Sequence, residues 1–388
     1  MSKKKYTFKK LVNDIHLWLG LGSGIILFLV CLSGTFLTFE EEIKGLFTEK
    51  LEVAAGSGKI SFEDLNQTLS KEGTVASITV SEDDLEPYEF RVKTSEQDRR
   101  GTLFYVDPYT GAYQKTQKSS VDEFFMTMFR MHRWLLMDSK IGRPIVGFAT
   151  IFFLFISITG VIMWFPKKMK WKNFKPGFKI KTSGNWKRTN HDLHNTLGFY
   201  ACIFLIIMTL TGLCWSFEWY RDASSVVLGT PVFGGRGGEK FDSNGDFPES
   251  ERKSITEIYS ISNKELDYEG KTIIGIPSTE KQPFSIRKYN ESNWSPVTAD
   301  QLVIDRNGAI LAKALFSDKP FNVQVASLIK PIHTGQIFGT FSKIIYFLAC
   351  LIATSLPVTG TIIWLNKMKK KNNKKRKTKS KIDTVPVN

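Results

Sequence analysis

The sequence predicts an integral membrane α-helical protein with four transmembrane helices, a two-fold internal repeat and two small α+β modules outside the membrane. Three observations support this fold class: four long uncharged runs, an alternation of charge between them, and short motifs that recur in the two halves of the chain. All five histidines also lie at or near the ends of the runs. Their placement indicates where the chemistry of the protein takes place.

The four runs are each long enough to cross a lipid bilayer as a helix. Each contains about 23 residues and no Asp, Glu, Lys or Arg, and a helix of that length covers the roughly 30 Å of a bilayer core. The runs lie at residues 17–39, 144–166, 195–217 and 344–366. No small-residue cleavage site follows the first run, so we interpret it as an uncleaved signal anchor.

The distribution of charge predicts the orientation in the membrane. The chain has 53 Lys and Arg against 38 Asp and Glu, a formal net charge of +15. The excess lies at the N-terminus, in 167–188 and in 367–381, whereas 40–123 is acidic and 219–335 is roughly neutral. Because basic loops remain in the cytoplasm, both termini and the loop between the second and third runs are expected inside. The pattern argues against a nucleic-acid binder and for contact with membrane lipid.

Two motifs occur once in each half of the chain. Asp-x-His-x3-Gly and Thr-Gly-x3-Trp begin at Asp14, Asp192, Thr159 and Thr359. The histidine of the first motif precedes a second glycine by 18 residues in both halves. Two halves of the same plan predict a parallel repeat about an axis along the membrane normal, so that equivalent histidines face each other across this axis.

Both exported segments show the pattern of a short helix followed by strands. Ser61 is the expected cap of a helix over 61–69, and a second helix is expected over 255–262. Alternation of apolar and polar residues predicts strands at 76–80, 88–92, 272–276 and 284–288, and each segment ends in a strand, an Asp and a glycine-containing turn, at 103–111 and 302–308. Each segment therefore predicts one small α+β module, and the glycine-rich stretch 229–238 is expected to be a connector.

The histidines form two candidate pairs. The repeat places His16 with His194 on the cytoplasmic side and His132 with His333 on the exported side. Ionisable residues at membrane depth are functional candidates, and imidazoles paired at two depths fit two bis-histidine b-type haems with axial iron ligands from facing helices. Space for the rings is expected at Gly20, Gly22, Gly24 and Gly198. Zinc is the competing metal, but no Cys or carboxylate cluster completes a four-ligand set.

His191 is the fifth histidine and leaves one assignment open. It precedes His194 by three residues, so the two share roughly one helical face. His191 is either an alternative ligand of the inner haem or a partner of its propionates. The corresponding residue of the first half is Asn13, and we favour His194 as the ligand.

Basic residues close to His132 depart from the topology rule, because they place positive charge on the outer side. The segment 124–136 is expected to be an interfacial amphipathic helix. The residues concerned are Arg130, Arg133 and Arg143. They either hold lipid headgroups or bind haem propionates or an anionic electron acceptor. No residue is assigned a catalytic role.

The recurring His-x3-Gly and Thr-Gly-x3-Trp spans, together with two exported modules, resemble the PepSY-associated transmembrane proteins, over about residues 8–368. The resemblance implies a di-haem cytochrome that carries electrons across the bacterial inner membrane and reduces a ferric siderophore to Fe(II) in the periplasm. The exported modules resemble PepSY domains, which would shape the acceptor site. The chain has no nucleotide or flavin motif, so a separate cytoplasmic donor or a quinol must supply the electrons.

The expected organisation has eight parts. They are the cytoplasmic stub with the first span (1–40), the first module (41–120), the interfacial helix with the second span (121–166), a basic loop (167–190), the third span (191–218), the second module (219–330), the fourth span (331–366) and a basic tail (367–388). Two other classes compete. A transporter for iron or siderophore needs polar residues within the spans, where only Ser and Thr occur. A sensor needs no paired histidines and predicts a colourless protein.

Overall fold

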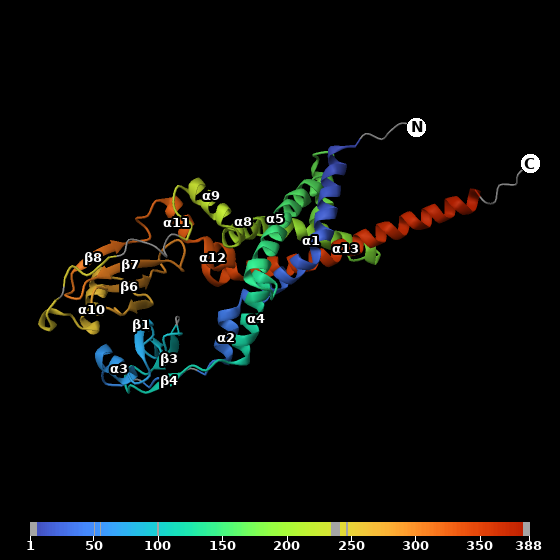
Figure 1. Cartoon of the computed structure of the whole chain (residues 1–388). Coiled ribbons are helices and arrows are strands. Elements are labelled where there is room, and N and C mark those ends of the chain that lie inside the picture. The colour runs from blue at the N-terminus through green and yellow to red at the C-terminus, as the bar shows by residue number, and fades with distance from the viewer. Residues whose placement is uncertain are drawn as a thin grey trace, which may run out of the picture.

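The computed structural model consists of a bundle of long apolar helices beside a separate antiparallel sheet (Figure 1). It describes residues 6–49, 51–54, 56–98, 101–233, 241–245 and 247–382. The larger part of the connector expected at 229–238 lies outside the described residues.

The four membrane spans that the uncharged runs predict are confirmed as long apolar helices in the described part of the chain. Their bounds by length and composition are Phe8–Leu37, Ser139–Trp164, Trp186–Ser216 and Gln336–Asn373. They contain α1 (Phe8–Leu37), α5 (Ser139–Trp164), α8 (Gly198–Ser216) and most of α13 (Gly339–Ile382). In the bundle α1 packs against α5 and α13, and α5 packs against α8.

The third span has an irregular start. Helix α7 (Trp186–Asp192) continues into a π-helical segment (Leu193–Leu197) and then into α8. A π-helical turn is rare and frequently marks a functional site, because it rotates the side chains relative to an α-helix. This turn contains His194.

Short helices lie where the chain leaves the spans. They are α2 (Glu40–Phe47), α4 (Ser120–Trp134), α9 (Glu218–Leu228), α11 (Phe321–Ser327) and α12 (Ile329–Thr334). Further short elements are α6 (Trp171–Phe174), η1 (Lys175–Phe178), η4 (Glu249–Glu251) and η5 (Gln336–Phe338). The expected interfacial segment is thus helical: α4 starts at a capping box of Ser119 and Asp122.

Asp122 also joins α4 to α2. Its carboxylate lies 3.2 Å from Lys44 Nζ. The backbone N–H of Ser119 and the nearby Lys44 ammonium hold the pKa of Asp122 below its usual range. The carboxylate therefore stays charged at neutral pH, and α4, which carries His132, is held by both contacts.

The two expected modules share one sheet. In the described chain its eight strands have the order β4-β3-β2-β1-β5-β6-β7-β8. The strands are β1 (Thr74–Val80), β2 (Tyr88–Lys93), β3 (Thr102–Val106), β4 (Tyr113–Lys115), β5 (Thr272–Gly275), β6 (Phe284–Tyr289), β7 (Ala299–Ile304) and β8 (Ile310–Ala314). All neighbours are antiparallel, and the pairing of β1 with β5 joins the first exported segment to the second.

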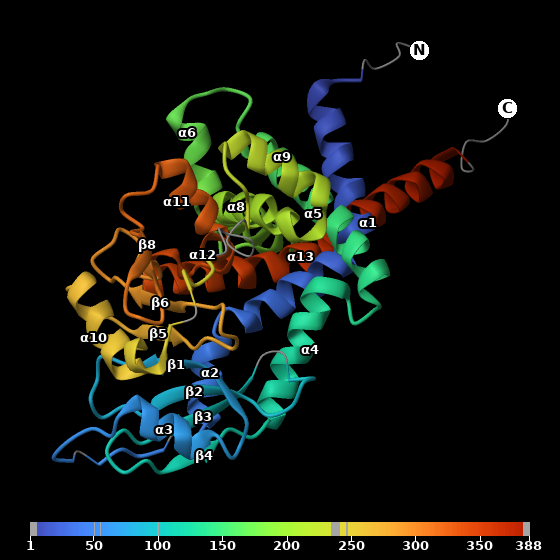
Figure 2. The ribbon, with the colours of Figure 1, turned by 60° about the vertical axis from the view of Figure 1, so that its left-hand side comes forward.

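Helices α3 (Phe62–Leu69) and α10 (Ile255–Glu265) cover one face of this sheet (Figure 2). Leu65 of α3 and Ile258 of α10 are fully buried in the same apolar core as Phe90 and Ile274 of the strands. The helices also contact each other, because Thr256 Oγ1 donates to Glu63 Oε2 at 2.7 Å. The core therefore crosses the junction between the two segments.

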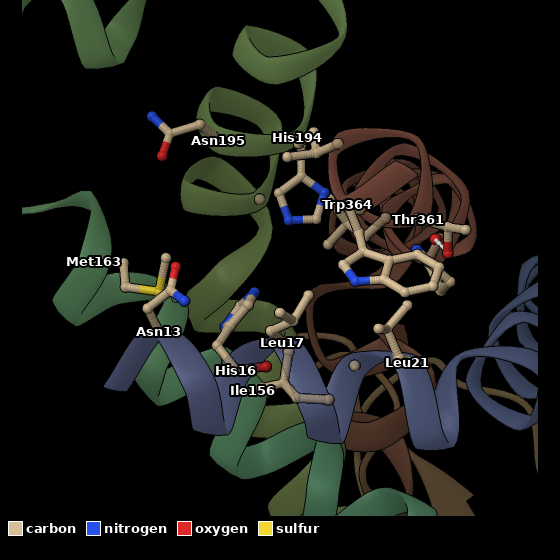
Figure 3. Close-up of a pocket in the computed structure, with 18 of the residues that line it drawn as sticks. Asn13, His16, Leu17, Leu21, Ile156, Met163, His194, Asn195, Thr361 and Trp364 are labelled. Carbon is tan, nitrogen blue, oxygen red and sulfur yellow. Dashed lines mark hydrogen bonds between the residues drawn. The ribbon is translucent and has the colours of Figure 1, made fainter. Parts of the chain in front are cut away.

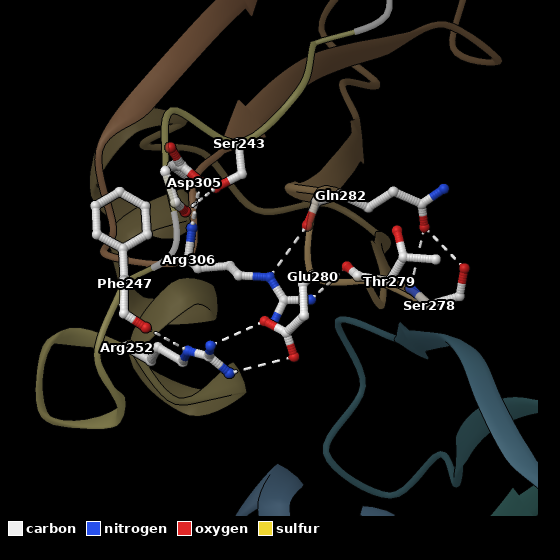
Figure 4. Close-up of polar contacts among 10 residues, drawn as sticks. Ser243, Phe247, Arg252, Ser278, Thr279, Glu280, Gln282, Asp305 and Arg306 are labelled. Atoms are coloured by element: carbon white, nitrogen blue, oxygen red, sulfur yellow. Dashed lines mark hydrogen bonds and ion pairs between the residues drawn. The ribbon is translucent and has the colours of Figure 1, made fainter.

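A surface network braces the loops of the second segment (Figure 4). Arg252 and Arg306 both approach the carboxylate of Glu280, at 2.9 and 3.5 Å. Asp305 accepts a hydrogen bond of 2.6 Å from Ser243 Oγ. These contacts tie the residues before α10 to the loop between β5 and β6 and to the turn after β7.

Candidate functional site

Four of the five histidines lie in two close pairs. His16 on α1 and His194 in the π-helical turn form the first pair, with ring centroids 6.2 Å apart. His132 on α4 and His333 on α12 form the second pair, also with ring centroids 6.2 Å apart. The structure thus brings together the residues that the repeat predicts as partners.

The separation within each pair fits two ligands on opposite sides of one metal ion. A metal–imidazole bond is about 2.0 Å long, which places the centres of two opposed rings roughly 6 Å apart. Each pair supplies two donors. Within the described residues, no group of three or more His, Cys, Asp or Glu lies close enough to hold a metal ion. Two axial donors suit a metal whose other ligands come from a macrocycle.

Hydrogen bonds fix the tautomer of the first pair. The Nδ1 atom of His16 lies 3.0 Å from Thr159 Oγ1, and that of His194 lies 2.9 Å from Thr359 Oγ1. Each threonine hydroxyl donates its own hydrogen to a backbone carbonyl one turn earlier in its helix. The hydroxyl oxygen must therefore accept from Nδ1–H, which leaves a lone pair on Nε2 for a metal.

The second pair has the same tautomer by a different route. His132 Nδ1 lies 2.9 Å from the carbonyl oxygen of Val30. His333 Nδ1 lies 3.0 Å from the carbonyl oxygen of Met208 and 3.0 Å from Thr211 Oγ1. A carbonyl only accepts, so Nδ1 carries the hydrogen in both rings. Burial lowers the pKa of His132 and lowers the pKa of His333 to about 3, so both rings are neutral, as metal ligation requires.

Every ring of the two pairs also rests on a glycine. A Cβ added at that glycine would lie close to the ring Cε1 atom: 3.3 Å for Gly160 and His16, 3.1 Å for Gly360 and His194, 3.2 Å for Gly34 and His132, and 2.9 Å for Gly212 and His333. The residue before each glycine is Thr or Ser. We call these dipeptides, at 33–34, 159–160, 211–212 and 359–360, the histidine cradles.

Each histidine and its cradle come from the same half of the chain, whereas each pair joins the two halves. His16 rests on α5 and His132 rests on α1, both before residue 165. His194 rests on α13 and His333 rests on α8. A ligand held by either pair therefore links the two halves of the bundle.

The two pairs lie at opposite ends of α1. His16 is near its start, and Gly34, which contacts His132, is near its end. The 18 residues between them correspond to about 27 Å along a helix axis. The pairs are thus placed near the two faces of the membrane that α1 is able to cross.

A hollow surrounds the first pair (Figure 3). Its cavity volume is about 210 Å³, and about 1340 Å³ when the open mouth and the adjoining solvent are included, so the two rings face an open space between the helices. Apolar residues and the cradle glycines form much of its lining, and Asn13, His191, Asn195 and Lys367 contribute polar groups. Gly20 and Gly198 line the hollow as well, but the rings themselves rest on other glycines.

His191 lines the hollow without pairing with His16. Its side chain is exposed, and its Nδ1 lies 3.5 Å from Asp192 Oδ1, at the limit of a hydrogen bond. The same carboxyl group accepts a hydrogen bond of 2.9 Å from Arg188 Nε. The structure thus places the ring of His194, which is tied to its cradle, opposite that of His16.

The three predicted arginines differ in their surroundings. Arg130 is exposed on α4. The Arg133 guanidinium lies 5.6 Å from the ring centres of Phe129 and Trp134. Arg143 has a buried Nε atom without a hydrogen-bond partner among the described residues. The exposed Arg130 is thus free to meet solvent or headgroups, whereas Arg143 is directed into the protein.

The sequence did not identify the groups that orient the rings. The Thr-Gly motifs were visible as repeats, but their role as cradles depends on which helix faces which histidine. The carbonyls of Val30 and Met208 have no sequence signal at all, since every residue has one.

The family model described as the PepSY-associated TM region matches residues 14–367. None of the curated proteins matches the chain.

Proposed function

Because the chain belongs to the PepSY-associated transmembrane family, we propose that it is a membrane oxidoreductase with two b-type haems. Electrons from a cytoplasmic donor or a quinol pass across the bacterial inner membrane and reduce a ferric siderophore in the periplasm, which releases Fe(II). The chemistry that a bound haem supplies is reversible one-electron transfer at its iron.

The observation that carries this proposal is the matched geometry of the two histidine pairs. Both have ring centroids 6.2 Å apart, and all four Nδ1 atoms are engaged by a cradle or its adjoining carbonyl. In the described part of the chain no hydrogen bond reaches Nε2 of these rings. His16 and His194 would hold the inner haem, and His132 and His333 the outer haem.

The residues around the pairs prepare these ligands. The hydroxyls of Thr159 and Thr359 and the carbonyls of Val30 and Met208 keep the hydrogen on Nδ1 and fix the ring direction. The cradle glycines let each ring lie directly against a helix. The mostly apolar lining of the hollow would pack against the flat ring of a haem held by the first pair.

We infer a two-fold repeat and an orientation from the same features. Each half contributes two spans, two cradles and four strands, and the strand order is mirrored about the β1–β5 junction. Basic residues at the N-terminus, in the 167–190 loop and in the tail favour the cytoplasm for these segments. The sheet is then periplasmic, on the side of the second pair.

The position of the sheet supports an acceptor site near the second pair. Ser295 Oγ, in the loop between β6 and β7, donates to the carbonyl oxygen of Ile337 at 2.7 Å. Trp294 Nε1 in the same loop donates to Gln324 Oε1 of α11 at 2.7 Å. The loop therefore lies on the elements that flank α12, which carries His333.

Visible spectroscopy of the full-length protein in mild detergent tests the proposal. We expect two b-type haems per chain in oxidised and dithionite-reduced spectra. His132→Ala and His333→Ala should each leave about one haem, and His16→Ala and His194→Ala should leave the other. Oxidation of the reduced protein by ferric siderophores then tests the acceptor. A colourless protein from cells with ample haem would refute the assignment.

A further inference from the structure

The corner between α4 and α5 is held in an unusual backbone conformation. Leu135 and Leu136 follow α4 with φ values of 54° and 60°, in the left-handed region that leucine rarely adopts. Gly142 on the first turn of α5 lies against the end of α4, because a Cβ there would be 2.0 Å from the carbonyl oxygen of Trp134. Such strain is kept where surrounding packing imposes it, often at functional sites.

This corner contains two buried hydrogen-bond donors without acceptors. Trp134 Nε1 and Arg143 Nε are buried and have no partner among the described residues. Only four buried side-chain atoms in the described chain lack a partner, and two of them belong to this corner. Buried N–H groups almost always donate a hydrogen bond, because a buried donor without an acceptor is energetically unfavourable. The corner is therefore prepared for a group that accepts hydrogen bonds.

The location and the donor types specify the group. Trp134 is the last residue of α4, the helix that carries His132, and Arg143 adjoins Gly142, which contacts the Trp134 backbone. An indole N–H and a guanidinium N–H donate and cannot accept, and a guanidinium carries a positive charge that favours an anionic acceptor. A carboxylate satisfies both requirements.

We propose that Trp134 Nε1 and Arg143 Nε bind a carboxylate beside the second histidine pair, and that this carboxylate is a propionate of the outer haem. The inference rests on the proposed function. It assigns the anchoring role to Arg143 and to Trp134, and leaves Arg130 and Arg133 outside it.

The experiment measures haemin binding by the full-length chain in detergent. A His16→Ala background removes the first pair, so that only the second pair is titrated. Trp134→Phe keeps the ring and removes the N–H, Arg143→Gln removes the guanidinium, and Arg130→Gln is the matched control. Each protein is titrated with haemin and with haemin dimethyl ester, in which both propionates are blocked.

We expect Trp134→Phe and Arg143→Gln each to weaken haemin binding about tenfold, the size of one charge-assisted hydrogen bond. Binding of the ester should be weak in the background protein and unchanged by either substitution, and Arg130→Gln should change neither. Size-exclusion profiles confirm that the variants are folded.

Three results would overturn the inference. If Trp134→Phe and Arg143→Gln bind haemin as tightly as the background protein does, these two residues do not anchor a propionate. If the substitutions weaken the binding of haemin and of its dimethyl ester equally, the two residues have a structural role and do not contact a propionate. Unchanged haemin binding with a raised KM for an anionic ferric chelate, measured with the first pair intact, assigns the carboxylate to the electron acceptor. Failure of the background protein to bind haemin at all would instead refute the proposed function, and the site with it.

Discussion

The first and second histidine pairs share a ring separation but differ in what holds the rings. Threonine hydroxyls accept from Nδ1 of both rings in the first pair. In the second pair backbone carbonyls accept from both rings, and a threonine hydroxyl, that of Thr211, reaches only His333. The first pair lies in long helices and lines a hollow. The second lies on the short helices α4 and α12, and Trp215 lies 5.2 Å from the ring of His333.

This comparison shows that the same ring separation occurs with different hydrogen-bond acceptors at Nδ1. A hydrogen bond from Nδ1 makes the imidazole a more basic ligand, and the effect follows the strength of the acceptor. Side-chain acceptors can be removed by mutation, and carbonyls cannot. We therefore expect substitutions near the first pair to change the electronic properties of its imidazoles. Substitutions near the second pair should mainly disturb its packing.

The largest effect is expected from crowding the second pair. Gly212→Ala places a methyl group 2.9 Å from Cε1 of His333, closer than carbon atoms approach without displacement. The ring must move, so the outer haem should be lost and the haem-to-protein ratio should fall from about two to about one. Gly45→Ala, on α2 and with no atom within 4 Å of an added Cβ, is the control and should retain both. If Gly212→Ala retained about two haems per chain, the ring of His333 would have room to shift.

A smaller effect is expected from the hydroxyls of the first pair. Thr359→Val removes the hydroxyl that accepts from His194 Nδ1 and leaves the nearby carbonyl of Leu356, so the imidazole should become less basic and the ferric state less stabilised. The midpoint potential of the inner haem should rise by about 40 mV, because a neutral hydrogen bond is worth about 1 kcal/mol and 59 mV is tenfold for one electron. A potentiometric titration measures the shift.

Two variants separate this effect from packing. Thr359→Ser keeps the hydroxyl and should restore the original potential. Ser33→Ala alters the cradle of His132, but the Ser33 hydroxyl donates to carbonyls of its own helix and not to the ring. The outer potential should therefore change less than the inner one does in Thr359→Val. Equal shifts at both haems would contradict the distinction between the pairs.

A still smaller effect should reach the second pair through α4. Asp122→Asn removes the charge that holds the start of this helix, and release of the outer haem to apomyoglobin should become about two- to fourfold faster. Because the pKa of Asp122 is lowered in the folded protein, its contribution is present above its ordinary pKa of about 4 and is lost only as the pH falls through the lowered value. The wild-type to variant difference should thus be the same at pH 7 and pH 6. A difference that vanishes at pH 6 would exclude this role of the carboxylate.

The sequence predicted the spans well because lipid imposes a strong constraint: a membrane helix needs a long run without charge. It predicted the partners within each pair because the repeat relates His16 to His194 and His132 to His333. Both inferences use distances along the chain, which a single sequence records directly.

The remaining features depend on contacts between distant segments. Alternation in β1 and β5 indicates which face is buried, but not that these two edges pair and merge the modules into one sheet. The glycines expected to make room were those nearest the histidines in sequence, whereas the rings rest on glycines of another helix. A spacing of three residues places His191 and His194 on one face, so the sequence also left open which of them faces His16; in the structure it is His194.

His191 therefore gives the smallest predicted effect and the sharpest test of the first pair. Since His191 is exposed and its Nδ1 faces Asp192, His191→Ala should retain both haems and the bis-histidine spectrum, whereas His194→Ala should lose the inner haem. Low-temperature electron paramagnetic resonance of the oxidised protein distinguishes the two low-spin centres. If His191→Ala lost the inner signal and His194→Ala kept it, His191 would be the inner ligand. The Thr359 cradle would then not orient a haem ligand.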